Sequence, residues 1–162
     1  MTFRKPPTLH RYYCANLWPA LLLLLSFAVN THAINKNEIS PENLKTSYIY
    51  NILKNITWPN EAKLKEFSVI YYGDNALYLK SLRLLQQQSI RGKKIQITSQ
   101  KNFNIIPGTQ VVIINQNKNN DLKDISRRLL KSNTLIITEN NNDKANVMIN
   151  FYRHDNHIKF EV

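Results

Sequence analysis

The residues Val111-Val112-Ile113-Ile114 (VVII) form an uninterrupted aliphatic block in the second half of the chain. Four consecutive apolar residues without polar alternation are typical of a strand that is covered on both faces, as in a parallel or mixed sheet. An asparagine-rich run follows at 115–120, and asparagine is an ordinary loop residue. We therefore expect 111–114 to form a central strand of an α/β domain, followed by a polar loop.

Strand and helix patterns alternate on both sides of this block. β-Rich runs at 67–72, 95–98 and 134–138 predict three further strands. Helical periodicity is found at 75–88 and 121–131. In the first of these two helices the expected buried residues are Leu77, Leu82, Leu84 and Leu85. The fold class predicted is α/β, with a mixed sheet of alternating strands and helices.

An earlier helix is expected to open at Ser40-Pro41-Glu42. Serine caps helices, proline tolerates the first helical position, and an acidic residue suits the first turn. Apolar residues then recur every four positions up to Trp58-Pro59, with Ile49 and Leu53 beside them; they are Leu44, Tyr48, Ile52 and Ile56. This stripe is predicted to face a core.

The last fifteen residues, MINFYRHDNHIKFEV at 148–162, predict an antiparallel hairpin that closes the sheet. Its two-residue turn is Asp155-Asn156, since both residue types tolerate positive φ. The register then pairs Arg153 with Ile158, Phe151 with Phe160, Asn150 with Glu161, and Tyr152 with Lys159. The apolar face needs cover, either from the first helix or from dimerisation or a partner; it carries Ile149, Phe151, Ile158, Phe160 and Val162.

His154 and His157 are expected to lie opposite each other beside this turn, with Cβ atoms about 5 Å apart. Zinc normally takes four ligands, and only Asp155 is near this pair. The histidines also lack a nucleophile and an orienting carboxylate at recognisable spacing. We interpret them as a solvated hairpin tip and predict neither a metal site nor a catalytic site.

The first 33 residues have the pattern of a secretory signal peptide. Basic residues precede an apolar run at 17–29, and Thr31-His32-Ala33 supplies a small residue for cleavage. The run is shorter than the roughly 20 residues that cross a bilayer. We expect a signal peptide at 1–33, an α/β domain at 34–162 and a periplasmic location.

Charge restricts the class of binding partner, and cysteine content restricts disulfide formation. The net charge of +11 falls to +8 without Arg4, Lys5 and Arg11 of the predicted leader. The remaining basic residues are scattered rather than arranged in a stripe, so we expect no nucleic acid and prefer an acidic partner or an anionic membrane surface. The mature chain would hold no cysteine and therefore no disulfide.

Enzyme motifs are not evident. Three glycines in the whole chain could hardly provide a phosphate-binding loop, and the sequence shows no paired carboxylates or nucleophile elbow. The prediction is a protein without catalytic activity and without a cofactor.

Five ordered segments carry a family resemblance: YIYNILK at 48–54 ending in Trp58-Pro59, FSVIYYGD at 67–74, IRGKKI at 90–95, MINF at 148–151 and IKFE at 158–161. Together they resemble the YfiR-like family of periplasmic regulators over nearly all of the predicted mature chain. The resemblance implies a small α/β domain, often dimeric, that binds and restrains an inner-membrane diguanylate cyclase. It would thereby lower cyclic di-GMP and biofilm formation, and an outer-membrane lipoprotein would sequester it.

The chain departs from the family pattern in three places. Many relatives carry cysteines, and relatives often have glycines where this chain has Lys144-Ala145-Asn146-Val147. Relatives also continue beyond the Phe-Glu pair into a terminal helix, whereas this sequence ends at Val162. From the resemblance we expect a lost C-terminal element.

Candidate partner-binding residues follow from the family pattern: Trp58, Arg91, Gly92, Asn150, Phe151 and Glu161. The alternative is a small-molecule-binding sensor domain that feeds a sensor kinase. In that case Trp58, Arg91 and two strand aromatics, Tyr71 and Tyr72, would line a pocket between helix and sheet. The same aromatics also suit a core, and Arg91 a turn, so both interpretations stand at this point.

Overall fold

The computed structural model describes residues 39–162. The predicted signal peptide at 1–33, and the residues from 34 to 38, lie outside the described residues. Between residues 39 and 162 no helix is both long enough and apolar enough to cross a membrane.

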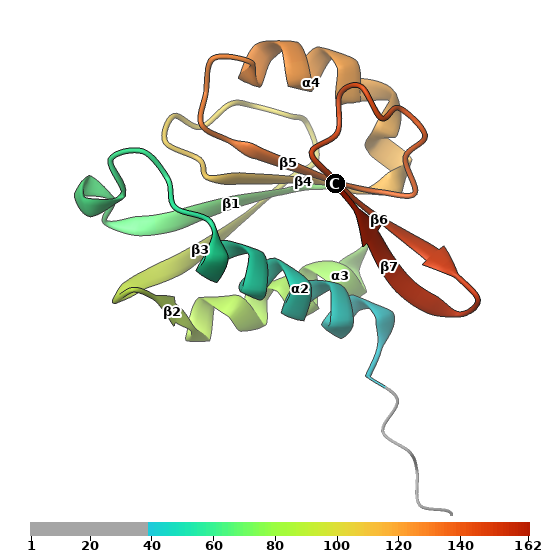
Figure 1. Ribbon diagram of the computed structural model, residues 1–162, viewed down its shortest axis with the longest axis horizontal. Coiled ribbons are helices and arrows are strands. Elements are labelled where there is room, and N and C mark those ends of the chain that lie inside the picture. The colour runs from blue at the N-terminus through green and yellow to red at the C-terminus, as the bar shows by residue number, and fades with distance from the viewer. Residues whose placement is uncertain (1–38) are drawn as a thin grey trace, which may run out of the picture. The chain divides into compact units, whose positions relative to one another are not determined.

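One seven-stranded sheet with helices on both faces makes up the described part of the chain (Figure 1). The α-helices are α2 (Pro41–Asn55), α3 (Ala76–Arg83) and α4 (Leu122–Leu129). The 3-10 helices are η1 (Glu61–Lys63), η2 (Leu84–Gln87) and η3 (Gln116–Asp121). The strands are β1 (Glu66–Tyr72), β2 (Ser89–Ile90), β3 (Lys93–Gln100), β4 (Val111–Ile114), β5 (Leu135–Glu139), β6 (Ile149–His154) and β7 (His157–Glu161).

The strands lie in the order β2-β3-β1-β4-β5-β6-β7. Strands β3, β1, β4, β5 and β6 are parallel, while β2 and β7 pair antiparallel at the two edges. The VVII block is β4, the fourth of the seven strands, and all four of its residues are fully buried. The predicted fold class and the predicted central strand are therefore confirmed.

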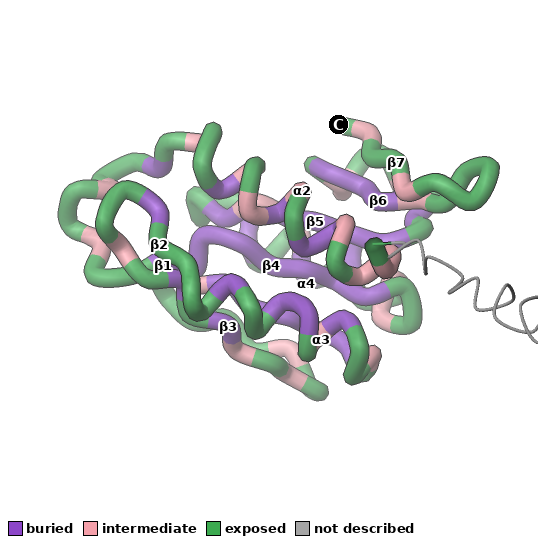
Figure 2. The backbone as a smooth tube through the Cα atoms, turned by 90° about the horizontal axis from the view of Figure 1, so that it is seen from below, coloured by how far each residue is buried: buried purple, intermediate pink, exposed green. Residues whose placement is uncertain are grey.

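Two apolar cores lie on opposite faces of the sheet. Helices α2 and α3 cover one face and α4 covers the other (Figure 1). Strand β4 serves both cores, since Val111 and Ile113 belong to the first and Val112 and Ile114 to the second. Figure 2 shows buried backbone running through the middle of the sheet. Burying each such side chain contributes about 1.5–3 kcal/mol relative to leaving it exposed.

The terminal hairpin has the predicted register. Phe151 lies opposite Phe160 and His154 opposite His157. The turn residues Asp155 and Asn156 have φ values of 48° and 60°. Helix α2 covers part of the apolar face, because the Tyr48 ring stacks on Phe151 with centroids 6.1 Å apart and lies 5.5 Å from Phe160.

Helix α2 starts as predicted, and its predicted apolar stripe faces the first core. The Ser40 hydroxyl accepts a hydrogen bond of 3.2 Å from the Asn43 backbone N–H. Within this stripe Ile49 and Leu53 are fully buried, whereas the four residues Leu44, Tyr48, Ile52 and Ile56 are half-buried. The helix is rotated so that Lys45, Ile49 and Leu53, also four residues apart, face the sheet.

Other local predictions were wrong. The helix predicted at 75–88 is divided into α3 and η2, and Leu77 and Leu84 are 70% and 50% exposed. Leu77 and Leu84 are seven residues apart, which places both on the outer face of this segment. Tyr78 is buried in the core instead. The asparagine run predicted as a loop contains η3, which the Asn115 side chain caps. No helix joins β3 to β4 or β5 to β6 in the described chain, so the alternation is incomplete.

Arg91 holds the C-terminal end of α2. It forms, with Gly92, the positive-φ turn between β2 and β3. Its guanidinium donates to the carbonyl of Lys54 at 2.7 Å and to that of Ile56 at 3.1 Å, and it pairs with Glu61, whose Oε2 lies 2.9 Å from Nη2. The last carbonyls of a helix lack intrahelical donors, so a cation is favourable there. The Arg91 hydrogen bond lowers the pKa of the Glu61 carboxyl.

Replacing the guanidinium should loosen this end of the helix. We expect Arg91→Met to lower the free energy of unfolding at pH 7 by about 1–2 kcal/mol, because partly exposed carbonyls and Glu61 lose their donor. The lowered pKa of Glu61 means that its contribution is complete above the unfolded pKa and is lost as pH falls through the folded value. The difference in unfolding free energy between Arg91→Met and wild type should therefore become smaller between pH 5 and pH 3, as measured by urea unfolding.

The neighbouring exposed Lys94 offers a matched control, and Lys94→Met should change the unfolding free energy little at either pH. An Arg91→Met deficit that is the same at pH 3 as at pH 7 would show that Glu61 is not the relevant partner.

Candidate functional site

A pocket of about 220 Å³ opens at the carboxyl ends of the parallel strands β4 and β5, beside the N-terminus of α3. The strand order reverses beside β1, since the chain runs from β1 through α3 to β3 on one side and then returns from β3 to β4 on the other side. In open α/β sheets, ligands bind outside the carboxyl ends of strands at such a point. This pocket, called here the carboxyl-end pocket, is the candidate functional site.

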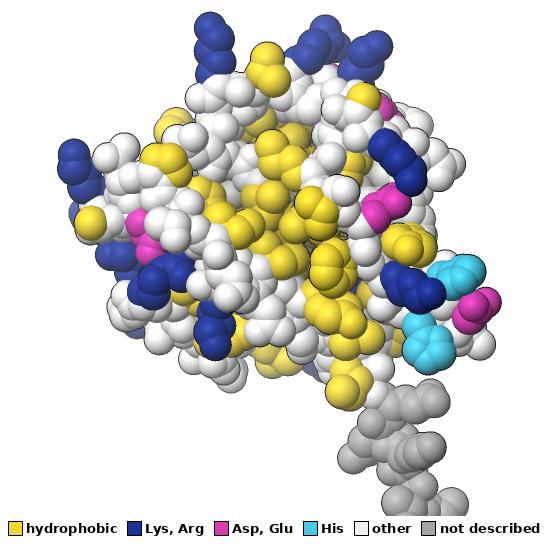
Figure 3. Space-filling model, in the orientation of Figure 1, with side chains coloured by type: hydrophobic (Ala, Val, Ile, Leu, Met, Phe, Trp, Pro, Cys, Tyr) yellow, Lys and Arg dark blue, Asp and Glu magenta, His cyan; other side chains and the backbone are white. Residues whose placement is uncertain are grey.

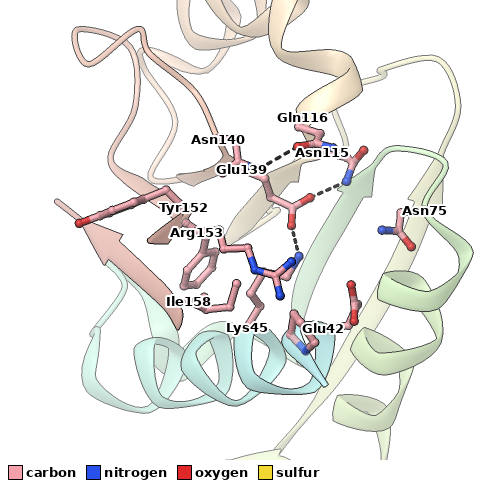
Figure 4. Close-up of a pocket in the computed structure, with 12 residues that line it drawn as sticks. Glu42, Lys45, Asn75, Asn115, Gln116, Glu139, Asn140, Tyr152, Arg153 and Ile158 are labelled. Carbon is pink, nitrogen blue, oxygen red and sulfur yellow. Dashed lines mark hydrogen bonds and ion pairs between the residues drawn. The ribbon is translucent and has the colours of Figure 1, made fainter. Parts of the chain in front are cut away.

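A buried charge network forms one wall of the pocket (Figure 4). Glu139, the last residue of β5, is 4% exposed. Its carboxylate accepts a hydrogen bond from the Lys45 ammonium of α2 and another from the Asn115 amide that follows β4. The Lys45 Nζ also lies 4.2 Å from the centroid of the Tyr78 ring. One carboxylate thus joins α2 to two central strands.

Charged and amide side chains make up the rest of the lining. Figure 4 shows the Arg153 guanidinium directed into the pocket, with Glu42 on the α2 side. The remaining polar residues of the lining are Asn75, Gln116, Asn140 and Tyr152, and the apolar ones are Pro41, Phe151 and Ile158. Such a lining can hold and orient a small charged molecule by hydrogen bonds and ion pairs. The lining residues include no serine, cysteine or histidine that could act as a nucleophile or an imidazole base.

Gly73 allows β1 and β4 to end close together at the pocket. A Cβ atom at this position would lie 2.5 Å from the Asn115 Cβ and 2.9 Å from the Tyr71 ring. Any side chain here would therefore displace Asn115, which donates to Glu139. Gly73 therefore has a positional role at the end of β1.

Trp58, Arg91 and Gly92 lie away from the pocket, near the amino end of β1. Trp58 is 6% exposed and packs edge-on against Phe67, with ring centroids 5.7 Å apart. The Arg91 guanidinium is 5.4 Å from the same Phe67 ring. The structure brings these three residues together as packing and capping groups at the C-terminal end of α2.

Tyr71 and Tyr72 point to opposite faces of the sheet. Tyr71 packs against Tyr78 on the α3 side, with centroids 5.5 Å apart. Tyr72 lies in the α4 core, where its hydroxyl donates to Asp121 at 2.6 Å, and this bond raises the pKa of Tyr72 to about 12. The two rings therefore do not line one cavity.

Asn150, Phe151 and Glu161 lie together in the hairpin. The Asn150 amide accepts from Thr138 at 2.9 Å and donates to Glu161 at 3.0 Å. That donated hydrogen bond, and a second from Lys144 at 2.9 Å, lower the pKa of Glu161. Of all eight predicted site residues only Phe151 lines the carboxyl-end pocket.

Sequence features could have identified some of the pocket residues that the sequence analysis missed. Asn115 and Glu139 directly follow the cores of two buried strands, and the carboxyl ends of parallel strands share one edge of a sheet. Lys45 is four residues before Ile49, so it lies on the buried face of α2. Arg153 appeared only as a partner of Ile158 in the hairpin register.

Among residues 39–162, no group of three or more histidine, cysteine, aspartate or glutamate side chains could hold a metal ion. The Nδ1 atom of His157 lies 2.7 Å from the Asp155 carbonyl oxygen. The Nε2 atom of His154 lies 3.2 Å from Asp155 Oδ2. Both contacts are local to the exposed hairpin tip.

Removing one partner of the buried Lys45–Glu139 ion pair should destabilise the fold, whereas removing both charges should not. We expect Lys45→Met to lower the free energy of unfolding by about 3–5 kcal/mol, because Glu139 would remain buried without its cation. Glu139→Gln should cost a similar amount by stranding Lys45. The double variant should recover most of the loss in a denaturant-unfolding cycle, whereas additive losses would contradict a direct coupling.

Comparison with known proteins adds family information to this geometry. No curated protein matches the chain. A family model described as YfiR/HmsC-like matches residues 42–162, which include nearly all of α2 and every later element through β7. The match agrees with the resemblance drawn from the sequence segments, and the chain belongs to the YfiR/HmsC-like family.

Proposed function

We propose that this chain is a periplasmic, noncatalytic signalling regulator that binds and restrains an inner-membrane diguanylate cyclase, and so lowers cyclic di-GMP and biofilm formation. The family match over residues 42–162 carries this proposal. The signal-peptide pattern at 1–33 supports export. A lining rich in amides and ion pairs, without serine, cysteine or histidine, suits binding better than catalysis.

A surface suited to a protein partner lies on the outer side of α3 and η2. Leu77 and Leu84 are 70% and 50% exposed there, and Lys80 and Arg83 between them are exposed. Beside Leu84 a groove of about 400 Å³ runs between η2 and α2, and its lining includes Tyr50. Exposed apolar groups with a basic border fit a partner with an apolar, acidic surface. We assign this leucine surface of α3 and η2 to the cyclase.

The proposal is tested by cyclic di-GMP measurement in the native host. Deleting the gene should raise cyclic di-GMP and biofilm mass, and the wild-type chain should restore both. Leu77→Glu/Leu84→Glu should fold normally yet fail to restore them, because charge would oppose an apolar contact. The same variant should lose co-purification with the cyclase from detergent-solubilised membranes.

Leu130 provides the matched control, since it is 81% exposed just after α4 on the other face of the sheet. Leu130→Glu should behave as wild type. Unchanged cyclic di-GMP after gene deletion would count against the cyclase as target, and equal failure of both variants would count against the leucine surface.

A second candidate function is a sensor domain for a small molecule that reports to a sensor kinase. The carboxyl-end pocket favours it, because Arg153 and Glu42 line one small cavity above a buried ion pair. A charged metabolite that binds there should raise the melting temperature saturably. Arg153→Ala should abolish that shift, while Arg83→Ala on α3, outside the pocket, should preserve it. A panel of charged metabolites without any saturable shift would argue against this function.

A further inference from the structure

Lysine side chains gather at the end of the sheet where β1 and β3 begin. Residues 54–66 and 91–94 contain six basic and two acidic side chains, a net charge of +4, which is half of the +8 of the predicted mature chain. Figure 3 shows Lys and Arg side chains gathered on the left of the view, where Figure 1 places β2 and the starts of β1 and β3. Five lysines define this surface, called here the basic end: Lys54, Lys63, Lys65, Lys93 and Lys94.

Specific contacts join the two segments into one surface. Strands β1 and β3 are parallel neighbours, so both begin at this end. The Lys93 ammonium donates to the Leu64 carbonyl at 2.8 Å, which ties the start of β3 to the segment before β1. Arg91 joins the turn after β2 to the last residues of α2, where it accepts no freedom from the Lys54 carbonyl 2.7 Å away. The basic end is therefore assembled by the fold from three separate elements.

The lysines of the basic end are available to an external anion. Four are exposed and Lys93 is half-buried. None of the five takes part in an ion pair within residues 39–162. Of the two acidic residues nearby, Glu61 is already paired with Arg91. Only Glu66, opposite Lys94 in the β1–β3 register, offsets the positive charge.

The residue type favours a broad anionic surface over a site for one small anion. A lysine ammonium is a strongly hydrated point charge on a flexible stem, whereas the planar fork of arginine suits bidentate recognition of a single carboxylate or phosphate. No large apolar side chain of residues 54–66 or 91–94 is exposed, so a contact here would be made by charge. A bilayer with anionic headgroups attracts such lysine clusters, and each lysine near it raises the affinity roughly five-fold.

We propose that the basic end docks on the anionic phospholipid headgroups of a membrane, as a reversible contact driven by charge. The groove beside Leu84 is lined by Tyr50, and the Lys54 Nζ lies 5.5 Å from the centroid of that ring. A chain docked in this way holds its leucine surface of α3 and η2 close to the bilayer, where a membrane-anchored partner is located. This role in the cell rests on the proposed function, but binding to lipid does not.

The test is co-sedimentation of the exported chain with large unilamellar vesicles at low salt. Vesicles of equal parts phosphatidylglycerol and phosphatidylcholine should bind the chain, and vesicles of phosphatidylcholine alone should bind it at least ten-fold more weakly. Raising the salt to about 1 M, where the Debye length is about 3 Å, should release the bound chain.

The triple variant Lys63→Gln/Lys65→Gln/Lys94→Gln tests the surface itself. It should bind the anionic vesicles at least ten-fold more weakly than wild type, because it lacks three of the five lysines. All three positions are exposed, so the fold should be retained, and circular dichroism checks this.

A second triple variant, Lys101→Gln/Lys123→Gln/Lys159→Gln, is the matched control. It removes the same charge from exposed positions outside the basic end. It should bind within about two-fold of wild type, because charges farther than a Debye length from the bilayer are largely screened.

Three results would overturn the proposal. The first is a wild-type chain that does not bind the anionic vesicles. The second is an equal loss of binding in both triple variants, which would show attraction by net charge without a defined surface. The third is binding to phosphatidylcholine alone that salt does not reverse, which would show an apolar contact. A chain that leaves vesicles unbound but retains an acidic protein through these lysines would assign the basic end to that protein. None of these results depends on the cyclic di-GMP measurement, so the two proposals can fail separately.

Discussion

The buried carboxylate of Glu139 is the constraint on which the arrangement of α2 over the sheet depends. Its two oxygens are occupied by Lys45 from α2 and Asn115 from the end of β4. Burying a carboxylate at 4% exposure costs free energy unless such partners are present, so these contacts favour the meeting of β5, β4 and α2 at this place. The apolar contacts of Ile49 and Leu53 add stabilisation but would tolerate other rotations of the helix.

Helix α2 is fixed by charge at both ends. Lys45 anchors its first turns to β5, and Arg91 holds its last carbonyls from the turn after β2. The carboxyl-end pocket adjoins the first anchor, and the groove beside Leu84 adjoins the middle of the same helix. A ligand that contacted Lys45 would therefore act on a helix that also borders the surface assigned to the partner. This continuity makes the sensor and regulator functions compatible within one domain.

The positions of most strands and the register of the hairpin were accessible from local pattern, whereas the strand order and most of the site were not. Short aliphatic runs such as VVII predict buried strands because they are rich in β-branched residues and too short for a helix. The hairpin register followed from the Asp155-Asn156 turn. The exact rotation of α2 was not accessible, since Leu44 and Ile49 both belong to the predicted apolar stripe and either could be its most buried part. Only the buried partner of Lys45 decides between them, and Glu139 lies 94 residues away in sequence.

The two edges of the sheet are protected in different ways. Strand β2 has two residues, Ser89 and Ile90, and Lys94 lies directly opposite Ser89 on the next strand. A short edge with a neighbouring cation offers little to an incoming strand. Strand β7 is longer, and its alternate residues are apolar on one face and of opposite charge on the other. Lys159 and Glu161 place charges on one face of this strand, and charged side chains on an edge discourage pairing with another strand.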